Sequence, residues 1–139
     1  MIGEMIEIRT WSPKVASRIF EDLQNRPLRP GEKLILIGNS GGGTVAIEAL
    51  DLLEEYGIHV DQVILRGSPV QEAALTNVTR VDYITSKFDY YYSYDSNPND
   101  SVVVQQHKVN FWGHTLPTSM VVVDVAELMM SLMVNGGGK

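Results

Sequence analysis

The fold is decided by the segment from Lys33 to Thr44, KLILIGNSGGGT, in which a short apolar run passes directly into a glycine-rich stretch. An apolar run such as Lys33 to Ile37 is typical of a strand that is buried on both faces of a parallel sheet. From Thr44 to Tyr56 apolar side chains recur at helical spacing, and Gly57 suits the end of a helix. The segment therefore predicts a strand, a sharp turn at Gly38 to Gly43, and a helix.

Strands and helices are expected to alternate along the rest of the chain. The expected strands are Met5 to Thr10, Val63 to Leu65, Val81 to Thr85 and Val102 to Phe111, and the expected helices are Pro13 to Gln24, a short one at Gln71 to Leu75, and Met120 to Val134. This alternation predicts the α/β class, with one domain over residues 1–139. We expect a short, mostly parallel sheet with helices on both faces and ligands at the carboxyl ends of its strands.

Composition and charge narrow the classes of function. The 139 residues are 44% hydrophobic and 20% charged, which is ordinary for a globular domain. A net charge of −6 without a long basic run argues against nucleic acid or an anionic membrane as the main partner. There is no cysteine, no signal-peptide pattern and no apolar run of transmembrane length, so we expect a cytoplasmic protein without disulfides. No metal and no cofactor are predicted.

The glycine-rich turn has the pattern of a nucleophilic serine. Gly38 to Gly42, GNSGG, matches G-x-S-x-G and stands between the predicted strand and the predicted helix. A serine there occupies a strained turn that lifts its hydroxyl clear of the sheet, so Ser40 is the predicted nucleophile. A closely packed turn without catalysis is one alternative. A phosphate-binding loop is another, but Thr44 follows Gly43 directly where that loop has a lysine.

With this turn the chain resembles the α/β-hydrolase family, in particular its lipase and esterase branch. The resemblance is carried by LILIGNSGGG at Leu34 to Gly43 and VILRGSPV at Val63 to Val70. It implies a triad in the chain order serine, acid, histidine. The acid implied is Asp89, three residues after Ser86. Asp95 and Asp100 lie further along the same loop, where aspartates are more typical of solvated turns. The histidine implied is His114, which follows the strand expected at Val102 to Phe111. His59 lies before the strand expected at Val63 to Leu65, far from that loop, and His107 lies within the strand expected at Val102 to Phe111.

The resemblance also implies a mechanism. His114 removes the proton of Ser40, Asp89 holds the imidazole tautomer, and the N–H of Gly41 donates to the oxyanion. The substrate is then a small-molecule ester or lipid, and the reaction is the hydrolysis of a carboxylic ester. The alternatives are a weak or inactive domain that uses the same fold for binding or assembly and, less favoured, a nucleotide-binding domain.

The chain departs from the family ahead of the nucleophile strand, where only Met5 to Thr10 is available. This implies a truncated α/β-hydrolase-like sheet without the loop that supplies the second oxyanion donor, a loss of about 10²–10³ in rate. We therefore expect slow hydrolysis of short activated esters. Leu34 to Ile37 would lie at a sheet edge, and Met120 to Val134 has more apolar residues than one buried stripe needs. Both features predict a homodimer or higher homo-oligomer.

Overall fold

The computed structural model describes residues 2–39, 41–67, 75–86, 102–109 and 120–134. Its elements follow in the order α1 (Ile2–Asn25), β1 (Lys33–Asn39), α2 (Gly41–Glu55), β2 (Val60–Arg66), β3 (Val78–Ser86), β4 (Val103–Val109), β5 (Met120–Asp124) and α3 (Val125–Val134). The strands and the long helix expected between residues 33 and 109 are therefore found, with altered ends. Most of the short helix expected at Gln71 to Leu75 lies outside the described residues. Its last residue, Leu75, is described and is not helical.

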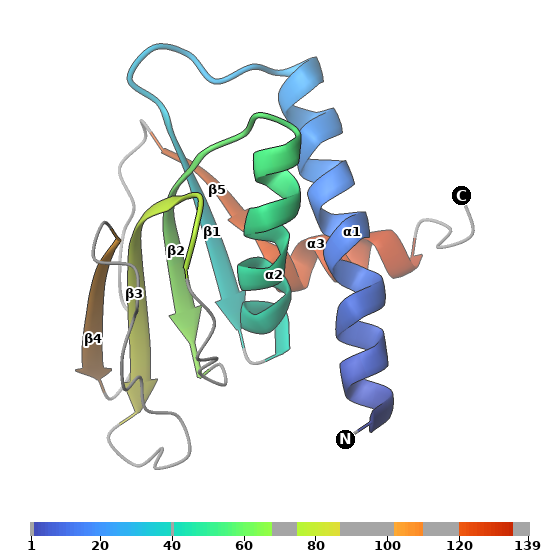
Figure 1. Cartoon of the computed structure of the whole chain (residues 1–139), viewed down its shortest axis with the longest axis vertical. Coiled ribbons are helices and arrows are strands. Elements are labelled where there is room, and N and C mark those ends of the chain that lie inside the picture. Colours follow the sequence, from blue (N-terminus) through green and yellow to red (C-terminus); the bar gives the residue numbers. More distant parts are fainter. Residues whose placement is uncertain (1, 40, 68–74, 87–101, 110–119, 135–139) are drawn as a thin grey trace.

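The five strands form one parallel sheet in the order β4-β3-β2-β1-β5 (Figure 1). This confirms the α/β class with a parallel sheet. The predicted edge position of Leu34 to Ile37 is wrong, because β1 lies between β2 and β5. Ile37, for example, is in register with Ile64 of β2 on one side and with Asp124 of β5 on the other.

The last predicted helix, Met120 to Val134, divides into a strand and a shorter helix. The reason lies in its first half, where three consecutive valines favour the pleated backbone of a strand. Asp124 then begins the helix as its N-cap, because its Oδ1 accepts hydrogen bonds from the backbone N–H groups of Ala126 at 3.0 Å and Glu127 at 3.2 Å.

The strand predicted at Met5 to Thr10 is also wrong, because these residues belong to α1. Residues 15, 16 and 19 of that helix are buried and anchor its second half against the core. A helix that is already formed extends at little cost, which favours the helical state of the preceding residues. Pro13 lies inside α1 although a proline has no N–H to donate to the preceding turn, and the structure gives no physical account of this. Neither α1 nor another helix in the described part of the chain is long and apolar enough to cross a membrane.

The side chains of the sheet alternate between two buried faces. Leu34, Leu36 and their neighbours face the three helices in the main core. Four isoleucines, Ile35, Ile37, Ile64 and Ile84, form a second buried cluster on the opposite face. All three described helices cover the first face (Figure 1), so helices on the second face stay a prediction for the rest of the chain.

Candidate functional site

The topology of the sheet locates a candidate site at the carboxyl ends of β1 and β5. From β1 the chain adds β2, β3 and β4 successively on one side, and β5 then pairs with the other side of β1. The strand order therefore reverses at β1. In open parallel sheets, ligands bind outside the carboxyl ends of the strands at such a reversal.

The turn that follows β1 contains a single residue between strand and helix. β1 ends at Asn39 and α2 begins at Gly41, so only Ser40, which lies outside the described residues, connects them. A Cβ atom added at Gly38 would lie 2.3 Å from the Cα and 2.7 Å from the N of Gly43. The end of the strand and the first turn of the helix therefore touch through their backbones, which only a glycine at position 38 allows.

The described residues leave space for a side chain at the other two glycines of the turn. A Cβ added at Gly41 would meet none of their atoms within 4 Å, and one at Gly42 would only touch the Cβ of Ala126 at 3.6 Å. The described contacts therefore require a glycine at position 38 and do not require one at position 42. The contact at Gly42 also shows that the first turns of α2 and α3 lie against each other.

The first turn of α2 provides backbone donors at this point. The first N–H groups of a helix have no partner within the helix, and the helix dipole is positive there. Gly41 is half-buried, Gly42 and Gly43 are buried, and this turn has no acidic side chain. The backbone next to Ser40 is therefore suited to a negatively charged group, as the predicted role of Gly41 requires.

Arg66 and Asp124 face each other across the end of β1. Arg66 ends β2 and Asp124 ends β5, and Arg66 Nη2 lies 3.9 Å from Asp124 Oδ2. Each side chain is about one quarter exposed, so at this distance the pair contributes at most about 1 kcal/mol. Because Asp124 also caps α3 with its other oxygen, the pair links the ends of the strands on both sides of the glycine-rich turn.

Neither Arg66 nor Asp124 is among the predicted site residues. Asp124 falls inside the helix predicted at Met120 to Val134, and Arg66 lies in the segment Val63 to Val70 that carries the family resemblance. One signal was present, since Asp124 and Glu127 have the D-x-x-E spacing of a helix start directly after a run of valines.

The predicted triad lies outside the described residues: Ser40, Asp89 and His114 are not described, nor is Asp95. The strand ends that precede the triad residues are described. Ser40 follows β1 directly, Asp89 comes three residues after the end of β3, and His114 comes five residues after the end of β4. Because the sheet is parallel, all three strands have their carboxyl ends at the same end of the sheet. His59 lies at the opposite end, directly before β2, where its Nε2 is 2.8 Å from Thr79 Oγ1.

A second polar cluster crosses β2, β3 and β4 away from the strand ends. Asp82 is buried and accepts two hydrogen bonds of 2.8 Å from Arg80 and one of 2.6 Å from Gln62. Arg80 also donates to Gln105 on β4. The hydrogen bonds with Asp82 raise the pKa of the Arg80 guanidinium. This cluster joins three strands, and in the described part of the chain no three acidic or histidine side chains gather as metal ligands.

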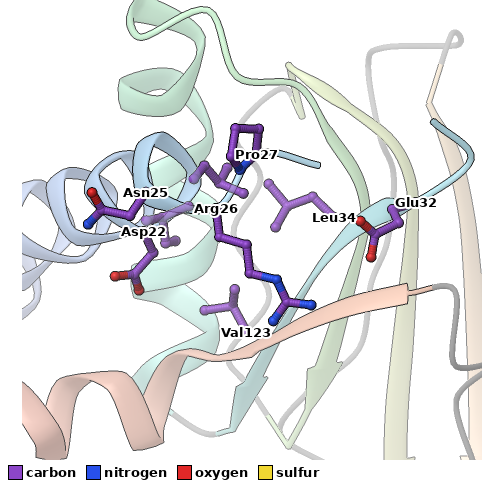
Figure 2. A pocket seen from close by; sticks show the side chains of 9 residues that line it. Asp22, Asn25, Arg26, Pro27, Glu32, Leu34 and Val123 are labelled. Atoms are coloured by element: carbon purple, nitrogen blue, oxygen red, sulfur yellow. The ribbon is translucent and has the colours of Figure 1, made fainter. Parts of the chain in front are cut away.

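A cavity of about 410 Å³ opens at the amino end of the sheet, between α1 and β5 (Figure 2). Its floor is apolar and its rim is charged, and it is lined by Ile19, Asp22, Leu23, Asn25, Arg26, Pro27, Glu32, Leu34 and Val123. It therefore lies apart from the glycine-rich turn at the carboxyl end.

The chain matches no protein-family model, no curated protein and no solved structure. The α/β class accordingly stands on the structure, and membership of the α/β-hydrolase family stays a hypothesis that rests on the sequence.

Proposed function

We propose that the protein is a serine hydrolase that acts on carboxylic esters, with Ser40 as the nucleophile. The observation that carries this proposal is the one-residue connection between the internal strand β1 and α2, closed by the backbone contact of Gly38 with Gly43. A nucleophilic serine needs a turn of this sharpness, because only then is its hydroxyl raised above the strand end and next to the first N–H groups of the helix.

The order of the strands supports Asp89 as the acid and His114 as the base. These residues follow β3 and β4, which are neighbours in the sheet, and β3 is separated from β1 only by β2. Adjacent strands are about 4.8 Å apart, so the ends of β3 and β4 lie roughly 10 Å and 14 Å from the end of β1. Asp89 and His114 come three and five residues after these two ends. At about 3.3 Å per extended residue, those residues can span roughly 10 Å and 17 Å, which is enough for the three side chains to meet as the mechanism requires.

The position of β5 bears on the second oxyanion donor. A strand-to-helix connection, β5 to α3, does lie beside β1, and Ala126 in its helix contacts the position of Gly42. However, the N–H groups of Ala126 and Glu127 already donate to Asp124. Two donors that could face the oxyanion are thus engaged, so we retain the proposal of slow hydrolysis, with the Gly41 N–H as the donor.

The proposal is tested with 4-nitrophenyl acetate and a fluorophosphonate probe on the purified chain. We expect slow turnover and covalent labelling, both lost in Ser40→Ala and strongly reduced in His114→Ala and Asp89→Asn, because an activated serine requires the base and its orienting acid. Ser17→Ala is the matched control, since Ser17 lies in α1 and not at a strand end. Equal rates and equal labelling for the wild type and Ser40→Ala would contradict the proposal.

Binding of a phosphate group is the second candidate. It is favoured by the space that the described residues leave at Gly41, next to the first turn of α2, and by Arg66 at the neighbouring strand end. If this candidate is right, inorganic phosphate or ATP stabilises the fold, by about 2.7 kcal/mol at one hundred times the dissociation constant, and the probe does not label Ser40. A domain without either response would be a non-catalytic binding or assembly domain.

A further inference from the structure

Within the described residues, the fifth strand has a partner on one side only. β5, with the sequence MVVVD, pairs with β1 and is the last strand in the order of the five-stranded sheet. The N–H and C=O groups on its outer side therefore point away from the sheet that the described residues form. A row of such groups on an apolar strand pairs readily with another strand.

The helix that follows β5 has apolar residues on its outward face as well. Its inward residues pack on the core, whereas Met130, Met133 and Val134 are 65%, 64% and 81% exposed. A helix with one buried stripe usually has polar residues on the opposite face. Figure 1 shows β5 passing behind β1 and α3 passing behind α1 and α2, so the strand and the helix both lie on the far side of the protein in that view.

We propose that this side, which we call the β5–α3 surface, binds a second copy of the chain. It consists of the outer edge of β5, the three exposed apolar side chains of α3, and the cavity between β5 and α1. Two copies pair their β5 strands antiparallel about a two-fold axis perpendicular to the sheet, and the sheet continues from one subunit to the other. This inference does not depend on the proposed hydrolase function.

Symmetry is the first argument for a second copy as the partner. A two-fold axis perpendicular to the sheet leaves both helical layers on the same face, so it brings α3 of one subunit toward α3 of the other when the two β5 strands pair. One operation therefore covers both the strand edge and the apolar helix face. An unrelated partner would have to provide a free strand and an apolar surface in the same arrangement.

Charge is the second argument. Antiparallel pairing sets the amino end of one β5 against the carboxyl end of the other. Arg26 is on the rim of the cavity at the amino end, where Figure 2 shows its side chain reaching toward Val123 and Glu32. Glu127 is exposed just beyond the carboxyl end. Among the described residues neither Arg26 nor Glu127 has an ion-pair partner within its own subunit, and the pairing brings them toward each other across the interface.

Sedimentation equilibrium and light scattering test the proposal on the full chain. We expect a mass of twice 15.5 kDa for the wild type at micromolar concentration. Met130→Glu with Met133→Glu should raise the dissociation constant at least about tenfold, because burying an unpaired charge is costly. Val103→Glu is the matched control, since Val103 is an exposed apolar residue on β4 at the opposite edge, and it should leave the mass unchanged.

A charge exchange tests the orientation. Arg26→Glu and Glu127→Arg should each weaken the dimer, and the double variant should restore it, since the pair is re-formed with opposite signs. Melting curves establish that each variant is folded. A wild type that is monomeric at several hundred micromolar would overturn the proposal, and so would a dimer that dissociates equally with Val103→Glu. A dimer without rescue in the double variant would overturn the antiparallel arrangement and assign the surface to another mode of pairing.

Discussion

Replacing Gly38 by alanine is the sharpest test of the turn on which the candidate site depends. The added Cβ would lie 2.3 Å from Gly43 Cα, 2.7 Å from Gly43 N and 2.9 Å from the carbonyl oxygen of Gly42. Carbon atoms in contact are normally about 3.5–4.0 Å apart, so β1 and α2 would have to separate by roughly 1 Å or more. Overpacking usually costs about 1–3 kcal/mol, and we expect the upper end or beyond, because all three neighbours are backbone atoms that no rotamer change can move.

Urea denaturation followed by circular dichroism measures this cost. With a denaturant dependence of about 1–3 kcal/mol per molar urea, a loss of about 3 kcal/mol lowers the midpoint by roughly 1–3 M. Ester hydrolysis, if the proposed function is right, should fall more than the folded fraction does, because the turn that aims Ser40 is itself displaced.

Two neighbouring glycines supply the controls. Gly41→Ala places its Cβ more than 4 Å from every atom of the described residues outside its own helix turn, and Gly42→Ala makes only an ordinary contact with Ala126. Neither position has a positive φ, so alanine is compatible with both and favours the helix by up to about 1 kcal/mol. Both variants should be as stable as the wild type or slightly more so. The reasoning fails if Gly38→Ala unfolds at the same urea concentration as the wild type, or if Gly41→Ala is equally damaging.

Three further substitutions test contacts away from the turn, each by urea denaturation. Asp124→Ala should cost about 1 kcal/mol through loss of the α3 cap. Asp124→Asn should cost much less, because it retains the cap and removes only the distant ion pair with Arg66. Equal costs would show that the cap is not the main contribution of Asp124. Asn77 has φ 57°, and its side chain donates to the carbonyls of Leu50 and Ile58. Asn77→Ala should therefore cost about 1–3 kcal/mol, and Asn77→Gly should cost less because glycine adopts a positive φ without strain. The reverse ranking would refute the role of the positive φ. Asp82→Ala should cost about 1–3 kcal/mol, because it leaves the side chains of Arg80 and Gln62 without their shared acceptor. An unchanged urea midpoint would show that water replaces the Asp82 carboxylate as the acceptor.

Local sequence signals predicted the centre of the fold. The run Leu34 to Ile37 is apolar at every position, and this is what a strand with two buried faces requires. The change from that strand to glycine and then to helical spacing placed the turn at Gly38 to Gly43. These features depend on neighbouring residues only, and they could therefore be recognised without knowledge of the tertiary structure.

The errors occurred where tertiary contacts decide the structure. Met120 to Val134 is apolar almost throughout, so its periodicity does not distinguish a buried strand from a buried helix, and the pairing of β5 with β1 selects the strand. For the same reason the edge at Leu34 to Ile37 was predicted in the wrong place. The contact of Arg66 with Asp124 could not be anticipated, because it requires the ends of β2 and β5 to flank β1.

The strand order also affects how the chain folds while it is synthesised on the ribosome. α2 and the strands β1, β2 and β3 are close in sequence, so their pairing can begin as soon as they emerge. In the described sheet, the place on the other side of β1 is filled by β5, which is translated much later than β1. Until then one side of the apolar strand that leads to Ser40 stays unpaired and open to other nascent chains. We expect a chaperone that shields extended apolar segments to hold the growing chain during this interval and to leave when β5 docks, so that a chain stopped before Met120 remains chaperone-bound or aggregates.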